Sequence, residues 1–144
     1  MKISTRGRYA LRVIIDLAEH NSENYIPLKD IVLRQEISQK YLEGIMTDLA
    51  KAGLLEGQHG KGGGYKLKRS PEKITVGDIL RLTEGDLAPI SCLEKNAEPC
   101  SRVAECRTLP MWENFYTLVK NYFDGITIAD LMKTNPTGGD NYII

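Results

Sequence analysis

Three cysteines are the side chains of this 144-residue chain with the clearest capacity for chemistry. Cys92, Cys100 and Cys106 lie in one short segment, separated by seven and then by five residues. This spacing is wider than the two-residue spacing of small zinc sites, but it allows a loop to wrap thiolates around a larger inorganic centre. Iron–sulfur clusters are held by cysteine thiolates, usually with four ligands in all. Three cysteines therefore predict a cluster with one ligand position left to another group.

The sequence leaves the fourth ligand unknown. Histidine is absent from the cysteine segment, because His20 and His59 both lie in the other half of the chain. A thiolate of a partner chain or an external small thiol would complete the set equally well. Three free thiols without metal, or a zinc ion, are the alternatives to a cluster. The nearby acidic candidates, each of which also suits a solvated surface, are Glu94, Glu98, Glu105 and Glu113.

Composition places the chain among soluble globular proteins, with 42% hydrophobic and 26% charged residues. No apolar run approaches the roughly 20 residues that span a bilayer, and no apolar signal core follows the basic N-terminus. We therefore expect a cytoplasmic protein without a membrane partner. Thiols stay reduced in that compartment, so the clustered cysteines favour metal or redox chemistry over a structural disulfide.

Charge divides the chain into two halves, although its net charge is zero. Residues 1–70 hold 12 Lys and Arg against 8 Asp and Glu, whereas residues 71–144 hold 7 against 11. A difference of this size also arises by chance. The charge difference supports nucleic-acid binding only because the basic half also carries a nucleic-acid-binding pattern.

The basic half has the pattern of a helix-turn-helix. Apolar residues at helical spacing predict a first helix over residues 5–19, and Pro27 suits the start of a second. Ser38 is the expected N-cap of a third helix, whose apolar face lies within residues 42–49 and which ends at Gly53. Two short helices joined by a brief turn are typical of DNA-binding proteins.

A glycine-rich hairpin is expected directly after the third helix. Residues 54–56 and 65–68 suit two short strands. Five of the eight residues from Gly57 to Gly64 are glycine, which suits a tip that turns sharply or lies close to another surface. A hairpin after a helix-turn-helix is the layout of a winged helix.

The acidic half is expected to carry the remaining helices. Thr75 and Asp78 have the spacing of a capping box that opens a helix. A loop with the cysteines follows, then a long helix that stops at Gly125 and a short helix capped by Thr127. The predicted fold class is mainly α with a small β-hairpin.

The third helix is the expected recognition helix, with its N-terminal side chains against base edges in the major groove. Gln pairs with adenine, Lys with guanine or phosphate, and Glu accepts from cytosine. The residues expected to contact bases, which lie mostly opposite the apolar face, are Ser38, Gln39, Lys40, Tyr41 and Glu43.

Two further segments are expected to contact DNA. In the wing, His59 and Lys61 suit a narrow minor groove, and Gly62 and Gly63 let the backbone approach the duplex. Phosphate contacts position a protein without reading sequence. They are expected near the start of the first helix, from Lys2, Ser4, Arg6, Arg8 and Tyr9. A polar helix face and a glycine loop on an unrelated α+β protein is the alternative interpretation.

Several segments together resemble a known bacterial family of winged-helix regulators, which includes the iron–sulfur regulator IscR, the nitric-oxide sensor NsrR and the cysteine-metabolism repressor CymR. The resemblance covers essentially the whole chain. It rests on residues 2–11 (KISTRGRYAL), 37–43 (ISQKYLE) and 60–65 (GKGGGY), on the three cysteines and on Trp112.

The resemblance implies a homodimer, in which the long C-terminal helix packs against its partner and two heads bind a pseudo-palindromic site on double-stranded DNA. By analogy with IscR the cysteines would hold a 2Fe–2S cluster, with 4Fe–4S as the alternative, and Glu43 would select between classes of DNA site. The implied interface residues are Trp112, Phe115, Val119 and Tyr122. The implied units are a winged helix-turn-helix DNA-binding domain over residues 1–83, a cluster loop over 84–108, dimerisation helices over 109–134 and a flexible tail over 135–144.

The chain departs from the family pattern at the cluster ligands. The gap between Cys92 and Cys100 is two residues longer than in IscR. Leu109 stands where that branch has a histidine ligand, and Arg8 stands where NsrR-type sensors have an acidic ligand. The departures leave both the fourth ligand and the cluster type open.

The sequence therefore predicts a DNA-binding transcriptional regulator that senses iron–sulfur cluster status and is not an enzyme. The alternative is a metal-free regulator of cysteine or sulfur metabolism that is controlled by cysteine synthase. This alternative rests on the chain end, Asn141-Tyr142-Ile143-Ile144, because the CymR branch ends similarly and works with that enzyme. A thiol enzyme is not favoured, because no histidine lies near the thiols and no phosphate-binding loop is evident.

Overall fold

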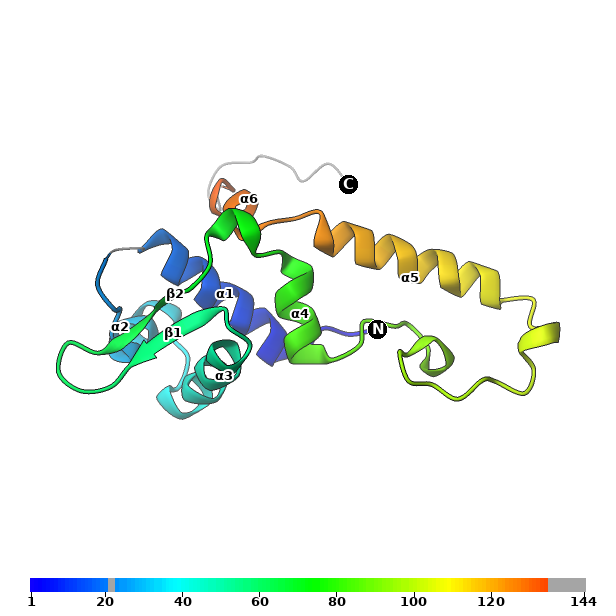
Figure 1. Ribbon diagram of the computed structural model, residues 1–144, viewed down its shortest axis with the longest axis horizontal. Coiled ribbons are helices and arrows are strands. Elements are labelled where there is room, and N and C mark those ends of the chain that lie inside the picture. Colours follow the sequence, from blue (N-terminus) through cyan, green and yellow to red (C-terminus); the bar gives the residue numbers. More distant parts are fainter. Residues whose placement is uncertain (21–22, 135–144) are drawn as a thin grey trace.

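Helices and one small sheet make up the computed structural model, which describes residues 1–20 and 23–134 (Figure 1). Over these residues no helix is both long and apolar enough to cross a membrane. The predicted fold class is confirmed. The helices are α1 (Thr5–Glu19), α2 (Leu28–Gln35), α3 (Gln39–Lys51), α4 (Val76–Glu84), α5 (Leu109–Asp124) and α6 (Ile128–Met132), the strands are β1 (Leu55–Gln58) and β2 (Gly64–Leu67), and short 3-10 turns lie at Pro71–Lys73, Ser91–Leu93 and Val103–Glu105.

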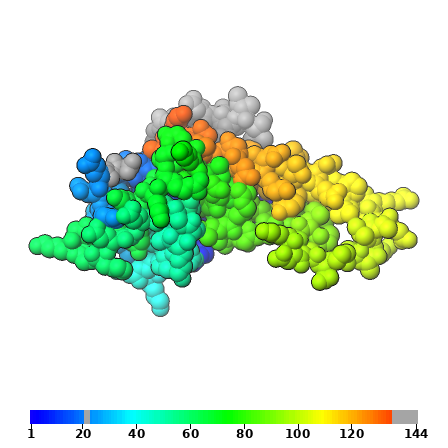
Figure 2. Space-filling view, in the orientation of Figure 1, coloured from blue at the N-terminus to red at the C-terminus, as the bar shows by residue number. Residues whose placement is uncertain are grey.

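The chain forms two lobes, which the space-filling view separates clearly (Figure 2). The first, here called the head, comprises α1 to α4, the hairpin and α6. The second, here called the arm, comprises residues 86–124, in which the cysteine segment runs beside α5 (Figure 1). The predicted helix-turn-helix and the cysteines therefore lie in different lobes.

Local capping signals set the helix ends where the sequence predicts them. The Ser38 hydroxyl accepts a hydrogen bond from the Tyr41 amide at 3.3 Å and caps α3. Thr75 and Thr127 open α4 and α6 with complete capping boxes. The strands lie nearer the hairpin tip than expected, because the antiparallel pairing extends to Gln58 opposite Gly64.

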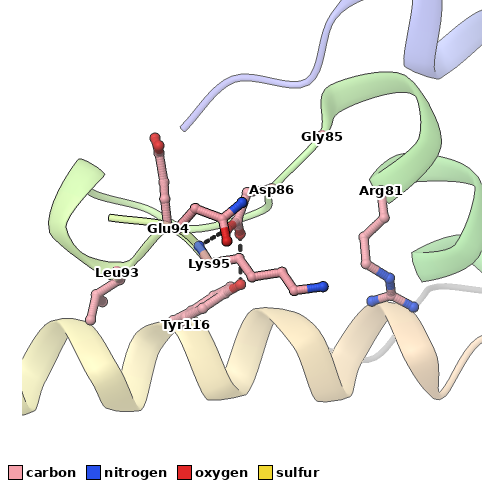
Figure 3. A pocket seen from close by; sticks show the side chains of 8 residues that line it. Arg81, Gly85, Asp86, Leu93, Glu94, Lys95 and Tyr116 are labelled. Atoms are coloured by element: carbon pink, nitrogen blue, oxygen red, sulfur yellow. Dashed lines mark hydrogen bonds between the residues drawn. The ribbon is translucent and has the colours of Figure 1, made fainter. Parts of the chain in front are cut away.

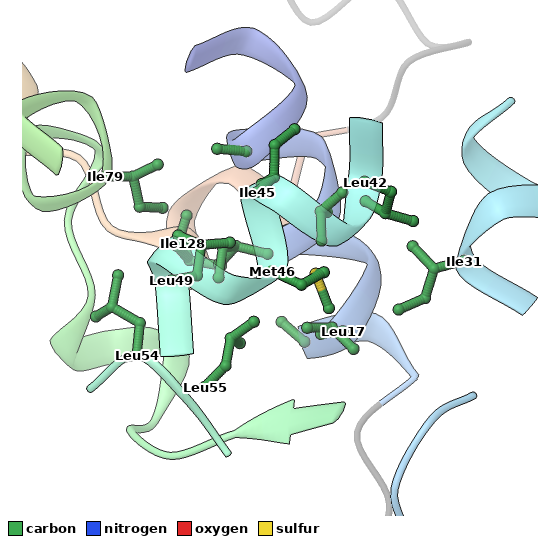
Figure 4. Close-up of a cluster of buried hydrophobic side chains, with 14 of the residues drawn as sticks. Leu17, Ile31, Leu42, Ile45, Met46, Leu49, Leu54, Leu55, Ile79 and Ile128 are labelled. Carbon is green, nitrogen blue, oxygen red and sulfur yellow. The ribbon is translucent and has the colours of Figure 1, made fainter. Parts of the chain in front are cut away.

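A single apolar core fills the head (Figure 4). The buried face of α3 packs against α2 and β1, and side chains of α1, α4 and α6 complete the same core. Ile128 of α6 is fully buried in this core, so the chain returns to the head after the arm. The largest fully buried side chains include Ile14, Leu17, Ile31, Leu42, Ile45, Met46, Leu49, Ile79 and Ile128.

A second, smaller apolar cluster joins the arm to the head. It is formed by Val76 and Leu80 of α4, Leu87 of the following loop and Val119 of α5. Val119 is 8% exposed and packs within its own chain. Its assignment to the dimer interface is therefore corrected: the residue faces α4, because α5 uses that side to dock on the head.

A buried ion pair fastens α1 to α2. Asp16 is the one charged residue buried in the head among those the structure describes, and its carboxylate accepts hydrogen bonds from Arg34 at 2.9 and 2.7 Å and from the Gln35 amide at 2.8 Å. Burial alone would raise the pKa of Asp16. The hydrogen bonds from Arg34 and Gln35 outweigh that effect and lower this pKa below its usual 3.8.

Replacing Asp16 with Ala is expected to lower the free energy of unfolding at pH 7 by about 2 kcal/mol, because Arg34 and Gln35 lose a charged acceptor. A carboxylate with a lowered folded-state pKa stabilises the protein above its unfolded pKa, and the contribution disappears as the pH falls through the folded value. The deficit should therefore shrink below about pH 4. Urea denaturation at pH 7 and pH 3 measures both effects, with the exposed Glu19→Ala on the same helix as the control. Equal stability of the two variants at pH 7 would contradict the assignment.

Candidate functional site

The recognition helix α3 presents a polar face to solvent. Its four buried apolar residues fix the helix on the core, so Gln39, Lys40 and Glu43 point outward and are exposed. The Gln39 amide donates to the Glu43 carboxylate at 3.1 Å, which orders the two side chains that are expected to read bases. Thr47 continues this exposed face one turn further, and its hydroxyl donates to the Glu43 carbonyl at 2.8 Å.

The start of α1 flanks the recognition helix, and its residues divide into two groups. Lys2 and Arg8 are exposed, as phosphate contacts require. Arg6 instead turns inward, where its guanidinium donates to the Gly44 carbonyl at 3.2 Å and pairs with the Asp48 carboxylate. Arg6 therefore docks α1 on α3.

Ser4 and Tyr9 are also engaged within the protein. The Ser4 hydroxyl accepts from the Gly7 amide at 3.0 Å and caps α1. The ring of Tyr9 lies edge-on to that of Tyr41 with centroids 5.7 Å apart, which links the starts of the two helices. The predicted DNA contacts of these residues stay predictions, and the structure adds positioning contacts to them.

The wing has a fixed backbone at its tip. Gly60 and Gly62 adopt left-handed φ values of 88° and 77°, and a Cβ added to Gly63 would lie 2.3 Å from the carbonyl oxygen of Gln58. Only glycine fits these positions without rearrangement. His59 and Lys61 are exposed beside them, on the loop expected to approach DNA.

A groove separates the wing from the recognition helix and adds residues that the sequence did not indicate. It has a volume of about 640 Å³, and α2 contributes Lys29 while α3 contributes Thr47 and Lys51. Backbone hydrogen bonds between Ile26 and Tyr65, at 2.8 and 2.9 Å, hold the start of α2 against the wing. The groove thus places a second basic flank beside the recognition face. Only this tertiary pairing brings Lys29 there.

The three cysteines line one small cavity in the arm. All three are free thiols; Cys92 and Cys100 are exposed and Cys106 is half-buried. The cavity, of about 160 Å³, lies between the cysteine segment and the first turns of α5. Its walls are formed by Cys92, Leu93, Pro99, Cys100, Val103, Cys106, Leu109 and Glu113.

The donor set of this cavity, three thiols and one carboxylate, is chemically compatible with an iron–sulfur cluster. Within residues 1–20 and 23–134, no three His, Cys, Asp or Glu side chains are close enough to hold one ion. A cluster of several irons spreads its ligands over a wider site than one ion does, and its natural ligands are thiolates. The Cys106 thiol donates to or accepts from the Thr108 hydroxyl at 3.5 Å. This hydrogen bond, with smaller help from backbone amides, lowers the pKa of Cys106 and favours its thiolate.

Asp86 ties the beginning of the cysteine segment to α5 (Figure 3). Its carboxylate accepts from the Tyr116 hydroxyl at 2.6 Å and from the backbone amides of Ala88 at 2.9 Å and Lys95 at 2.7 Å. The hydrogen bond to Asp86, together with partial burial of the Tyr116 hydroxyl, raises the pKa of Tyr116 to about 12. An open cavity of about 620 Å³ lies around this tether and extends to Arg81. Every contact of the tether therefore restrains the segment that carries Cys92.

The sequence of the chain matches a family of known regulators. Residues 3–134 match the model of the Rrf2 family, described as an iron-dependent transcriptional regulator. The chain belongs to the Rrf2 family. It is thus a DNA-binding transcriptional regulator, as predicted, and its relatives are regulators rather than enzymes.

Individual relatives cover nearly the whole chain. The protein rrf2 of Nitratidesulfovibrio vulgaris is 41% identical over 133 residues, which are 92% of this chain and 88% of that protein. CymR of Bacillus subtilis is 39% identical over 131 residues, 91% of this chain and 89% of CymR. The solved structure of that protein, named the global cysteine regulator, superposes with a TM-score of 0.74 over 94% of this chain and 99% of its own. The structure of T. potens IscR has a TM-score of 0.71 and 36% identity, over 92% of this chain and 87% of its own.

Replacing Lys29 with Ala is expected to weaken binding to specific and unrelated DNA by a similar factor, roughly fivefold, and to reduce the slope of affinity against salt concentration by about one. The reason is that a phosphate contact carries no sequence information. Fluorescence anisotropy at several salt concentrations measures both quantities. Lys73→Ala, in the turn that packs against α6, is the matched control. An unchanged salt slope in the Lys29 variant would remove the groove from the DNA-binding surface.

Proposed function

We propose that this Rrf2 regulator is a homodimer whose affinity for DNA is set by an iron–sulfur cluster, with Cys92, Cys100 and Cys106 as ligands. The observation that carries the proposal is the single cavity lined by all three thiols, in a lobe separate from the recognition helix. A 2Fe–2S cluster is preferred, and 4Fe–4S is the alternative. When bound, the cluster would supply a redox-sensitive and removable cross-link within the cysteine segment.

Dimerisation is supported by an apolar stripe on α5. Met111, Phe115, Leu118 and Tyr122 recur at heptad-like spacing and are 53%, 39%, 67% and 55% exposed. A row of large apolar side chains in solvent is typical of an interface, and this spacing matches the seam of two packed helices. The stripe retains Phe115 and Tyr122 from the sequence-based interface and adds Met111 and Leu118. A twofold pair of heads would then meet two halves of a pseudo-palindromic DNA site.

Signal transfer from the arm to the DNA-binding face is supported by contacts at the end of α4. The Glu84 carboxylate accepts from the Ser4 hydroxyl at 2.5 Å and from the Ser4 amide at 3.1 Å. Glu84 lies two residues before the Asp86 tether, and Ser4 lies two residues before Arg6, which holds the recognition helix. A displacement of the cysteine segment would therefore reach α3 through Asp86, Glu84, Ser4 and Arg6, with the bend at Gly85 between the first two.

A metal-free regulator of cysteine metabolism is the second candidate function. It is favoured by the 39% identity to CymR of Bacillus subtilis. In this version cysteine synthase would bind the segment that contains Ile143 and Ile144. These two residues lie outside the part of the chain that the structure describes. The thiols would then remain unligated, and the arm would transmit binding of the enzyme instead of cluster occupancy.

Anaerobic purification separates the two functions. The cluster predicts a coloured protein with stoichiometric iron and sulfide. Its visible absorption disappears in the Cys92→Ser, Cys100→Ser, Cys106→Ser triple variant, and its promoter affinity changes when the cluster is removed by chelation. A colourless protein, whose promoter affinity responds to cysteine synthase and is insensitive to the triple substitution, would overturn the proposal in favour of the second candidate. Removal of Ile143 and Ile144 should abolish that response.

Replacing Glu84 with Ala is expected to reduce the coupling between cluster and DNA. The variant should load the cluster normally, because Glu84 does not line the cysteine cavity. The ratio between the DNA affinities of the cluster-bound and cluster-free forms should come about tenfold closer to one than in the wild type. This change corresponds to a loss of about 1.4 kcal/mol of coupling free energy. Binding curves for both forms measure this ratio, with the exposed Glu72→Ala as the control. An unchanged ratio would exclude the Glu84–Ser4 contact from the route.

A further inference from the structure

We infer that Glu113 is the fourth protein ligand of the cluster, an inference that rests on the proposed function of the three cysteines. The observation is the composition of the cysteine cavity. Of the eight residues that line it, four carry a group able to ligate iron, and these are the three cysteines and Glu113. The other four are Leu93, Pro99, Val103 and Leu109.

The other acidic residues near the cysteines are placed elsewhere. Glu94 lines the open cavity around the Asp86 tether, together with Arg81 and Lys95. Glu98 and Glu105 are exposed and are absent from the walls of the cysteine cavity. All four acidic candidates that the sequence offered are exposed, and Glu113 alone among them lines the cavity of the three cysteines.

The Glu113 carboxylate is available for ligation. Its backbone carbonyl accepts from the Thr117 hydroxyl at 3.0 Å. Across residues 1–20 and 23–134, no hydrogen bond or ion pair engages its carboxylate. Because Glu113 lies on a regular helix, no backbone has to be ordered when its carboxylate binds iron, and only the rotamer freedom of the side chain is lost.

Helix geometry explains why the ligand comes from this position. Leu109 and Glu113 are four residues apart on α5, so their side chains lie one above the other on the same face. Leu109 closes the cavity with an apolar wall, and Glu113 supplies the donor one turn further along. At 3.6 residues per turn, this face lies about half a turn from the exposed stripe of Met111, Phe115, Leu118 and Tyr122.

A carboxylate ligand would give the cluster one weaker bond. Thiolates are soft donors that suit iron–sulfur centres, whereas carboxylates are hard donors that protonate and exchange more readily. The iron bound to Glu113 would therefore be the first to leave or react. Because Glu113 lies on α5, loss of that bond would release the helix that carries the dimer stripe.

Anaerobic full-length protein in four forms tests the inference: wild type, Glu113→Gln, Glu113→Cys and the matched control Glu105→Gln. The readouts are iron content, visible absorption, the electron paramagnetic resonance of the dithionite-reduced protein, and the half-life of the cluster in the presence of a chelator. Circular dichroism of the metal-free forms checks that each variant folds.

We expect Glu105→Gln to match the wild type, and Glu113→Gln to lose its cluster about tenfold faster with shifted resonance. Glu113→Cys should restore a long-lived cluster with a spectrum moved towards that of full thiolate ligation. If the wild type loads a cluster and Glu113→Gln has the same spectrum and half-life, the inference fails while the proposed function stands. A wild type without iron overturns both.

Discussion

Helix α1 is the constraint on which the rest of the structure depends. It packs against α2, α4, α6 and β2, so each of these elements takes its position from one rigid rod. Two hydrogen bonds near the start of α1 connect it to its neighbours. Glu84 of α4 accepts from Ser4, and Arg6 donates to a backbone carbonyl of α3. The end of α4, which leads into the arm, and helix α3 therefore share a neighbour. Because a close-packed core has low compressibility, a helix in this position is suited to transmit a shift from one end to the other.

Features that depend on near neighbours in the chain are those the sequence predicted well. The bounds of α1 agree with its apolar spacing, and Ser38, Thr75 and Thr127 cap helices as their residue types and spacing indicate. Capping and amphipathic spacing depend on residues three or four positions apart, which a sequence displays directly. The same holds for the exposed face of α3, because it is fixed by the buried face opposite.

Features that depend on distant neighbours were not predictable. Arg6 and Lys29 are both basic, yet Arg6 turns inward to a carbonyl 38 residues away, whereas Lys29 lines the groove beside the wing. Val119 and Leu118 are adjacent apolar residues on α5, and only the position of α4 decides which one is buried. The tether at Asp86 has no sequence signature at all, since its partner Tyr116 lies a whole loop later.

The narrow attachment of the arm has a mechanical consequence. Helix α5 has 16 residues, so it is about 24 Å long at 1.5 Å per residue. It meets the head mainly where Val119 packs on Val76 and Leu80. The part of α5 that extends from this joint, from Val119 back to Leu109, is about 15 Å long, so a tilt of about 5° at the joint moves its far end by about 1.3 Å. In the homodimer that we propose, the movements of two such levers would add, so a minor repacking under Val119 would change the separation of the two α3 helices along the duplex.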